Sequence, residues 1–135
     1  MENLIINVAV MDGGYSAACD KIPGWVVAYT GDLDGFKQYL VESIDFWIEG
    51  VREDGLPYDK IFDGKYELVY KWDIQSLLLH YQGIFSFSAL QTITGINQKQ
   101  LCHYAAGRSK PRVQQAEKIE AGLHTLAKEL LTISV

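Results

Sequence analysis

Residues 86–112 read Ser-Phe-Ser-Ala-Leu-Gln-Thr-Ile-Thr-Gly-Ile-Asn-Gln-Lys-Gln-Leu-Cys-His-Tyr-Ala-Ala-Gly-Arg-Ser-Lys-Pro-Arg, two short helical patterns separated by a glycine. Ser88 is a candidate N-cap of the first helix, Gly95 supplies the positive φ that ends it, and Asn97 is suited to cap the second. The second helix would bury three residues at i, i+3 and i+4 spacing, Leu101, Tyr104 and Ala105. The pattern predicts two helices joined by a tight turn, as in a helix-turn-helix.

The solvent side of this second helix and the loop after it are polar and basic. Their candidate contact residues are Gln98, Lys99, Gln100, His103, Arg108, Lys110 and Arg112. No carboxylate lies between Gly95 and Arg112. Amide side chains can read base edges and cations can contact phosphates, so we predict that these residues bind operator DNA. A helical hairpin with no role in DNA binding is the alternative that the same residues allow.

The net charge of −5 hides a division along the chain. Residues 1–72 hold six Lys and Arg against thirteen Asp and Glu, a net charge of −7. Residues 73–135 hold six against four, a net charge of +2. An acidic front half and a basic rear half predict two domains with different partners, 1–72 and 73–135.

The front half predicts four strands and one long helix. Alternating and β-branched residues favour strands at 4–11, 15–19, 25–30 and 65–72. Asp32 is the expected N-cap of a helix between the last two strands. The apolar stripe of that helix is Phe36, Leu40, Ile44, Trp47, Ile48 and Val51. The predicted fold class is therefore α+β, a ββ-β-α-β domain followed by a small all-α domain.

The opposite side of the long helix is charged and carries Lys37, Glu42, Asp45, Glu49 and Glu53. We predict that Glu42, Asp45 and Glu49 bind a protein partner, because an acidic surface attracts a basic one. A solvated surface with no partner is the alternative.

No residue pattern indicates catalysis, a metal site or a cofactor. Asp12, Asp32 and Asp34 occupy turn and capping positions where aspartate is favoured in any case. The histidines show no i, i+4 pair, and the chain has no Gly-rich phosphate loop or nucleophile elbow. We therefore expect a protein that is not an enzyme.

The two cysteines, Cys19 and Cys102, are far apart and in no metal spacing, so we expect buried reduced thiols. No apolar run reaches the roughly 18 residues that a membrane span requires. The first residues lack the basic region and cleavage site of a signal peptide, which predicts a cytoplasmic protein.

Residues 112–131 predict a long final helix. Its apolar stripe is Ala116, Ile119, Leu123, Leu126, Ala127 and Leu130. Such a stripe can cover the small core of the rear domain or pair with its copy. Because a helix-turn-helix protein that binds a near-palindrome is usually dimeric, we predict a homodimer or a higher homo-oligomer.

The run from Gly13 to Asp32, Gly-Gly-Tyr-Ser-Ala-Ala-Cys-Asp-Lys-Ile-Pro-Gly-Trp-Val-Val-Ala-Tyr-Thr-Gly-Asp, resembles the HicB antitoxin family. Members of that family carry a Gly-Tyr strand, a proline-glycine loop, a strand ending in Gly-Asp-Thr and an amphipathic helix. Leu33 stands here in place of the threonine, and the first proline of the loop is replaced. The rear half resembles the Xre/Cro type of helix-turn-helix.

The resemblance implies a partial ribonuclease-H-like domain without catalytic function. It further implies an antitoxin of a type II toxin-antitoxin system that neutralises a HicA-like mRNA interferase and represses its own operon. The alternative is a stand-alone transcriptional regulator whose front domain senses a ligand or mediates dimerisation. An RNA-processing enzyme built on the front fold is a third hypothesis.

Overall fold

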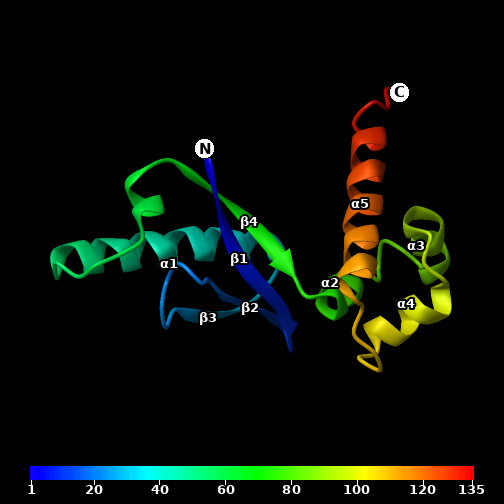
Figure 1. Ribbon diagram of the computed structural model, residues 1–135, viewed down its shortest axis with the longest axis horizontal. Coiled ribbons are helices and arrows are strands. Elements are labelled where there is room, and N and C mark those ends of the chain that lie inside the picture. The colour runs from blue at the N-terminus through cyan, green and yellow to red at the C-terminus, as the bar shows by residue number, and fades with distance from the viewer. The chain divides into compact units, whose positions relative to one another are not determined.

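The computed structural model describes residues 1–135 and divides into two compact units, unit 1 (Met1–Asp73) and unit 2 (Ile74–Val135). A four-stranded sheet lies in unit 1, and four of the five α-helices lie in unit 2 (Figure 1). The α+β class predicted from the sequence is confirmed. The division falls one residue later than the boundary expected from charge and composition.

The sheet of unit 1 has the order β3-β2-β1-β4. Its strands are β1 (Glu2–Met11), β2 (Gly14–Ala18), β3 (Val26–Thr30) and β4 (Tyr66–Trp72). The first three strands pair antiparallel, and β4 pairs parallel with β1. The β1–β2 turn requires two glycines, because Gly13 has a φ of 75° and a Cβ on Gly14 would lie 1.8 Å from the carbonyl oxygen of Tyr29.

Helix α1 (Leu33–Glu53) covers one face of this sheet. It begins where the sequence predicts, since the carboxylate of Asp32 accepts a hydrogen bond from the N–H of Gly35 at 2.8 Å. Its buried stripe is Phe36, Leu40, Ile44 and Ile48. This stripe belongs to one apolar core with Leu4, Ile6 and Val8 of β1. The four-residue spacing of the stripe leaves the opposite side of the helix in solvent.

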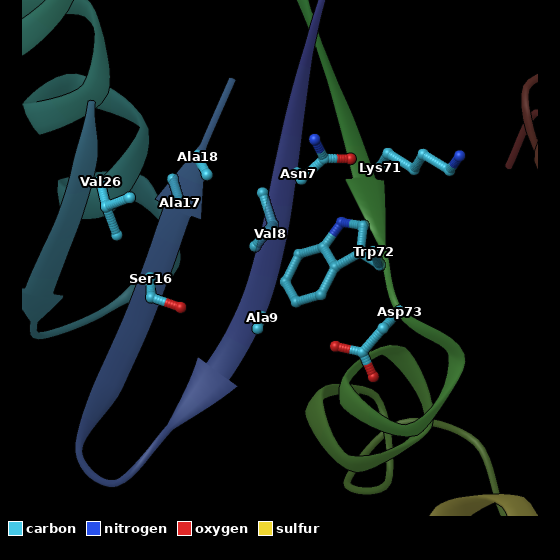
Figure 2. A pocket seen from close by; sticks show the side chains of 10 residues that line it. All are labelled: Asn7, Val8, Ala9, Ser16, Ala17, Ala18, Val26, Lys71, Trp72 and Asp73. Atoms are coloured by element: carbon cyan, nitrogen blue, oxygen red, sulfur yellow. The ribbon is translucent and has the colours of Figure 1, made fainter. Parts of the chain in front are cut away.

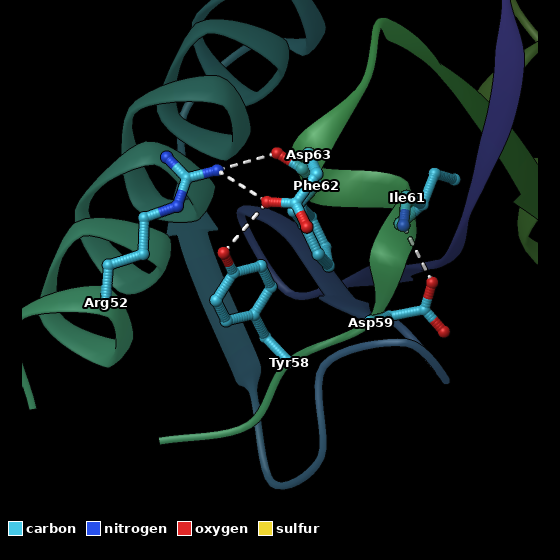
Figure 3. A network of polar contacts seen from close by, with 6 residues as sticks. All are labelled: Arg52, Tyr58, Asp59, Ile61, Phe62 and Asp63. Carbon is cyan, nitrogen blue, oxygen red and sulfur yellow. Dashed lines mark hydrogen bonds and ion pairs between the residues drawn. The ribbon is translucent and has the colours of Figure 1, made fainter. Parts of the chain in front are cut away.

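The C-terminal end of α1 is fixed by polar contacts with a short 3-10 helix, η1 (Lys60–Asp63) (Figure 3). Arg52 donates to the carbonyl oxygen of Phe62 at 2.7 Å and lies 3.6 Å from the carboxylate of Asp63. The hydroxyl of Tyr58 donates to the same carboxylate at 2.8 Å. Asp59 caps η1 by accepting from the N–H of Ile61 at 2.9 Å, and this bond lowers the pKa of Asp59. No local sequence pattern predicts these contacts.

Unit 2 is a bundle of α2 (Ile74–His80), α3 (Phe87–Thr94), α4 (Gln98–Ala105) and α5 (Val113–Leu130). Its core contains Leu78, Leu90, Ile96, Leu101, Tyr104, Ala105 and Ile119. Helix α5 packs on α3 so closely that a Cβ on Gly122 would lie 2.5 Å from the carbonyl oxygen of Ile93. Only the first half of the predicted α5 stripe enters the core. Leu130, near the C-terminal end of α5, is 53% exposed.

No helix combines the length and the apolar character needed to cross a membrane.

Candidate functional sites

The turn between α3 and α4 is held by backbone and side-chain bonds that fix where α4 begins. Gly95 takes the left-handed conformation with a φ of 76°, as the sequence predicts, and its N–H donates to the carbonyl oxygen of Gln91 at 2.8 Å. The side chain of Asn97 accepts from the N–H of Lys99 at 2.8 Å. The side chain of Gln91 accepts from the N–H of Gln98, also at 2.8 Å. Two of the unpaired N–H groups at the start of α4 are thereby satisfied.

The residue after the turn, Ile96, is buried at 3% exposure and anchors the corner in the core. Thr94 donates its hydroxyl to the carbonyl oxygen of Leu90 at 2.7 Å and accepts from the N–H of Ile96 at 3.2 Å. The threonine is therefore a buried polar group with both roles of its hydroxyl filled. The turn is therefore held both by a buried apolar side chain and by hydrogen bonds.

The predicted N-cap of α3, Ser88, was wrong by two positions. Ser86, two residues before Ser88, accepts from the N–H of Ala89 at 3.0 Å. Helix α3 starts at Phe87, so Ser88 lies inside its first turn and is exposed. An N-cap bonds the N–H three residues ahead, and only Ser86 has that relation to the observed first turn.

Helix α4 ends in a Schellman arrangement that fixes the start of the basic loop. Gly107 has a φ of 75° and donates to the carbonyl oxygen of Tyr104 at 3.2 Å. The N–H of Arg108 donates to the carbonyl oxygen of His103 at 2.9 Å. The chain therefore leaves α4 in a defined direction, and its cationic side chains follow within a few residues.

Most of the predicted DNA-contact residues lie together on the outside of α4 and on the loop that follows it. The exposed ones are Gln98, Lys99, His103, Arg108, Lys110 and Arg112. Gln100 differs, because its side-chain amide is half-buried and donates to the hydroxyl of Ser109 at 3.2 Å. Gln100 therefore ties the loop to α4, and it is a poorer candidate for base contact than Gln98 or Lys99.

The expectation of two buried thiols was half wrong. Cys19 is buried, and its burial raises the pKa of its thiol. Cys102 is exposed on the same helix as Lys99 and His103. Cys102 lies three residues after Lys99 and therefore on the same side of the helix, so its exposure could be predicted from the sequence spacing.

The acidic residues predicted to bind a partner lie on the solvent side of α1, where Glu42, Asp45 and Glu49 are all exposed. Glu42 accepts a hydrogen bond from the side-chain amide of Gln38 at 3.0 Å. The ion pairs of unit 1 involve other carboxylates, since Lys21 pairs with Asp59 and Arg52 with Asp63. The charge of this side of α1 is thus not neutralised within the helix.

A shallow cavity of about 370 Å³ lies on the sheet of unit 1, a feature that the sequence analysis missed (Figure 2). It is lined by Asn7, Val8, Ala9, Ser16, Ala17, Ala18, Val26, Lys71, Trp72 and Asp73. Register brings Ala9 beside Ser16, and Asn7 beside both Ala18 and Lys71. Small side chains at adjacent register positions leave the hollow, and alternation along the strands could not reveal it without the register.

No group of histidine, cysteine and carboxylate side chains in the chain is arranged to hold a metal ion.

Comparison of the chain with protein-family models, with curated proteins and with solved structures gave no match.

Proposed function

We propose that the chain is an antitoxin-like repressor. Unit 2 binds operator DNA through the outer side of α4, and unit 1 binds and neutralises a small basic toxin of the HicA type. In this proposal unit 1 is a HicB-like, partial ribonuclease-H-like domain, and unit 2 is a helix-turn-helix domain of the Xre/Cro type. Neither unit is assigned a catalytic role.

The observation that carries the DNA half is the capped helix α4 with its exposed polar and basic residues. A recognition helix reads bases from its N-terminal residues, and the exposed Gln98 and Lys99 occupy that place in α4. Arg108, Lys110 and Arg112 follow on the loop, where cations suit phosphate contact. Unit 2 holds six Lys and Arg against three Asp and Glu, which favours association with DNA.

A second copy of the chain completes the proposal. One unit 2 offers few phosphate contacts, so useful affinity requires two linked copies. The exposed apolar residues near the end of α5 supply a surface for pairing, since Leu130 and Ile133 are 53% and 63% exposed. These residues continue the apolar stripe beyond the part that the core of unit 2 uses.

The DNA half is tested with the double variant Gln98→Ala, Lys99→Ala and the DNA segment upstream of the protein's own gene. We expect affinity to fall by on the order of 2 kcal/mol or more, and the slope of log affinity against log salt to fall by about 1. The double variant Gln82→Ala, Lys128→Ala is the matched control, since both residues are exposed helix or turn residues of unit 2. Equal affinity of all three proteins in a fluorescence-anisotropy titration would contradict the assignment of α4.

The toxin half is tested by expressing the adjacent short, basic reading frame with and without this chain. Arrest of growth by that frame alone and recovery on co-expression support an antitoxin. A genome with no such frame beside this gene, or a frame without toxicity, contradicts it.

A stand-alone regulator with a ligand-sensing unit 1 is the second candidate. The cavity on the sheet favours it, because small-molecule sites have volumes of roughly 300–1,000 Å³ and this one is about 370 Å³. The co-expression experiment distinguishes the two candidates, because a stand-alone regulator would not restore growth.

A further inference from the structure

Phe46 is a large aromatic side chain left in solvent on an otherwise well-packed helix. It is 80% exposed, whereas Phe36 of the same helix is fully buried. It is also the one aromatic among the exposed large hydrophobic residues of the chain. A single exposed apolar residue is common on protein surfaces, so what distinguishes Phe46 is the charged surface around it.

The neighbours of Phe46 on the helix surface are carboxylates. Glu42 precedes it by four residues, Glu49 follows by three and Glu53 by seven, spacings that place all of them on one side of a helix. All of these glutamates are exposed. At i+4 stands Gly50, where an added Cβ would meet nothing within 4 Å. The ring therefore stands beside open space and between acidic side chains.

The two cations of α1 are committed elsewhere and do not offset this charge. Lys37 lies over the ring of Tyr70 of β4, with its amine 4.9 Å from the ring centroid. Arg52 is held by the carbonyl oxygen of Phe62 and the carboxylate of Asp63, as Figure 3 shows. Both cations therefore contact residues of unit 1 that lie outside α1. The outer side of α1 keeps its negative charge.

This charge decides between possible occupants. Nucleic acid and anionic membrane surfaces are repelled by a row of carboxylates. A second copy of the chain would oppose the same glutamates to one another, and like charges across an interface are unfavourable. A basic protein gains from the contact, because carboxylates at a rim steer it and a central aromatic gives it an apolar anchor.

We propose that Phe46, ringed by Glu42, Glu49 and Glu53, is the centre of a docking surface for a basic protein with an apolar pocket rimmed by Lys and Arg. The proposal rests on the toxin-binding role of unit 1 and adds to it the residue that anchors the contact. Interface anchors of this kind are typically aromatic and lie at the centre of a patch whose charged rim excludes water. The predicted partner residues Glu42 and Glu49 belong to that rim.

The test starts with a photo-crosslinking phenylalanine derivative placed at position 46 of the full chain in its native host. The same derivative at position 84 is the control, since Ile84 is 72% exposed and lies in unit 2. We expect a cross-link to one basic protein from position 46 and none to that protein from position 84. Cross-links from position 46 that contain only nucleic acid, lipid or a second copy of this chain overturn the proposal, and so does the lack of any cross-link.

The cross-linked protein is then purified and its affinity measured against three forms of the chain by calorimetry. We expect Phe46→Ala to weaken binding by about 30-fold, which is about 2 kcal/mol. Val26→Ala is the control, because Val26 is a 73% exposed apolar residue on β3 of the same unit and we expect less than a threefold change. An affinity of Phe46→Ala within threefold of the parent chain overturns the proposal.

Charge is tested separately from the anchor. The double variant Glu42→Gln, Glu49→Gln should lower the association rate about tenfold at low salt and leave the dissociation rate within threefold, as expected for rim charges. An association rate that is the same in the double variant and at high salt would contradict the steering role of Glu42 and Glu49. A captured basic protein that binds through Phe46 but does not arrest growth overturns the antitoxin role and supports the docking surface. A toxin that binds equally well to Phe46→Ala supports the antitoxin role and overturns the docking surface.

Discussion

Helices α1 and α4 each turn a specialised side to solvent, but they are held in place by different means. Helix α1 has 21 residues and a buried stripe of four apolar side chains, so its position follows from packing along its length. Helix α4 has eight residues and depends on its ends, where Asn97, Gln91 and Gly107 satisfy the terminal backbone groups. A short helix has few backbone hydrogen bonds of its own, so bonds at its ends contribute a larger share of its stability.

The outer sides of the two helices also carry opposite charge. Glu42, Asp45 and Glu49 make that of α1 acidic, whereas α4 and its loop carry Lys99 and Arg108 and no carboxylate of their own. Under the proposed function, each of these surfaces repels the class of partner that the other attracts. Such separation gives specificity, because a wrong encounter is opposed by like charge as well as lacking contacts.

The largest expected effect compares the buried side of α1 with its exposed side. Phe36→Ala should cost roughly 3–5 kcal/mol of unfolding free energy, because the ring is fully buried and stacks on Tyr15 at a centroid distance of 5.0 Å. Phe46→Ala should change stability by less than about 0.5 kcal/mol. Denaturant unfolding followed by circular dichroism measures both. Similar losses from the two substitutions would show that Phe46 is covered after all.

The second comparison uses one helical glycine from each unit. Gly122→Ala should destabilise unit 2 by roughly 1–3 kcal/mol, because its Cβ would lie 2.5 Å from the carbonyl oxygen of Ile93, although alanine favours the helix. Gly50→Ala should stabilise unit 1 by about 0.5–1 kcal/mol, since its Cβ meets open space. Amide hydrogen exchange assigns each change to its unit. A neutral or stabilising effect of Gly122→Ala would mean that α5 can move away from α3 at little cost.

What the sequence predicts well here is whatever periodicity and charge determine. The buried stripe of α1 follows from the four-residue spacing of its members, which places them on one side of the helix: Phe36, Leu40, Ile44 and Ile48. The turn at Gly95 is equally predictable from the sequence, since a positive φ favours glycine.

What it predicts poorly depends on atoms brought together from distant parts of the chain. The bond from Gln100 to Ser109 and the contacts of Arg52 with η1 follow from how loops return, which no local pattern records. The cavity on the sheet requires register as well as alternation. Phe46 lies outside the apolar stripe in the sequence, and its exposure follows from the helical periodicity.

The smallest of the expected effects concerns the cap of α3, which orients the helix that leads into α4. Ser86→Ala should cost about 1 kcal/mol, because it removes the acceptor 3.0 Å from the N–H of Ala89. Ser88→Ala, two residues on, should be neutral or slightly stabilising, since Ser88 is exposed within the first turn and alanine favours a helix. Thermal unfolding of the two variants side by side measures the difference. A larger loss from Ser88→Ala would restore the cap expected from sequence and shift the start of α3. It would also weaken the argument that end bonds, more than buried area, position the short helices of unit 2.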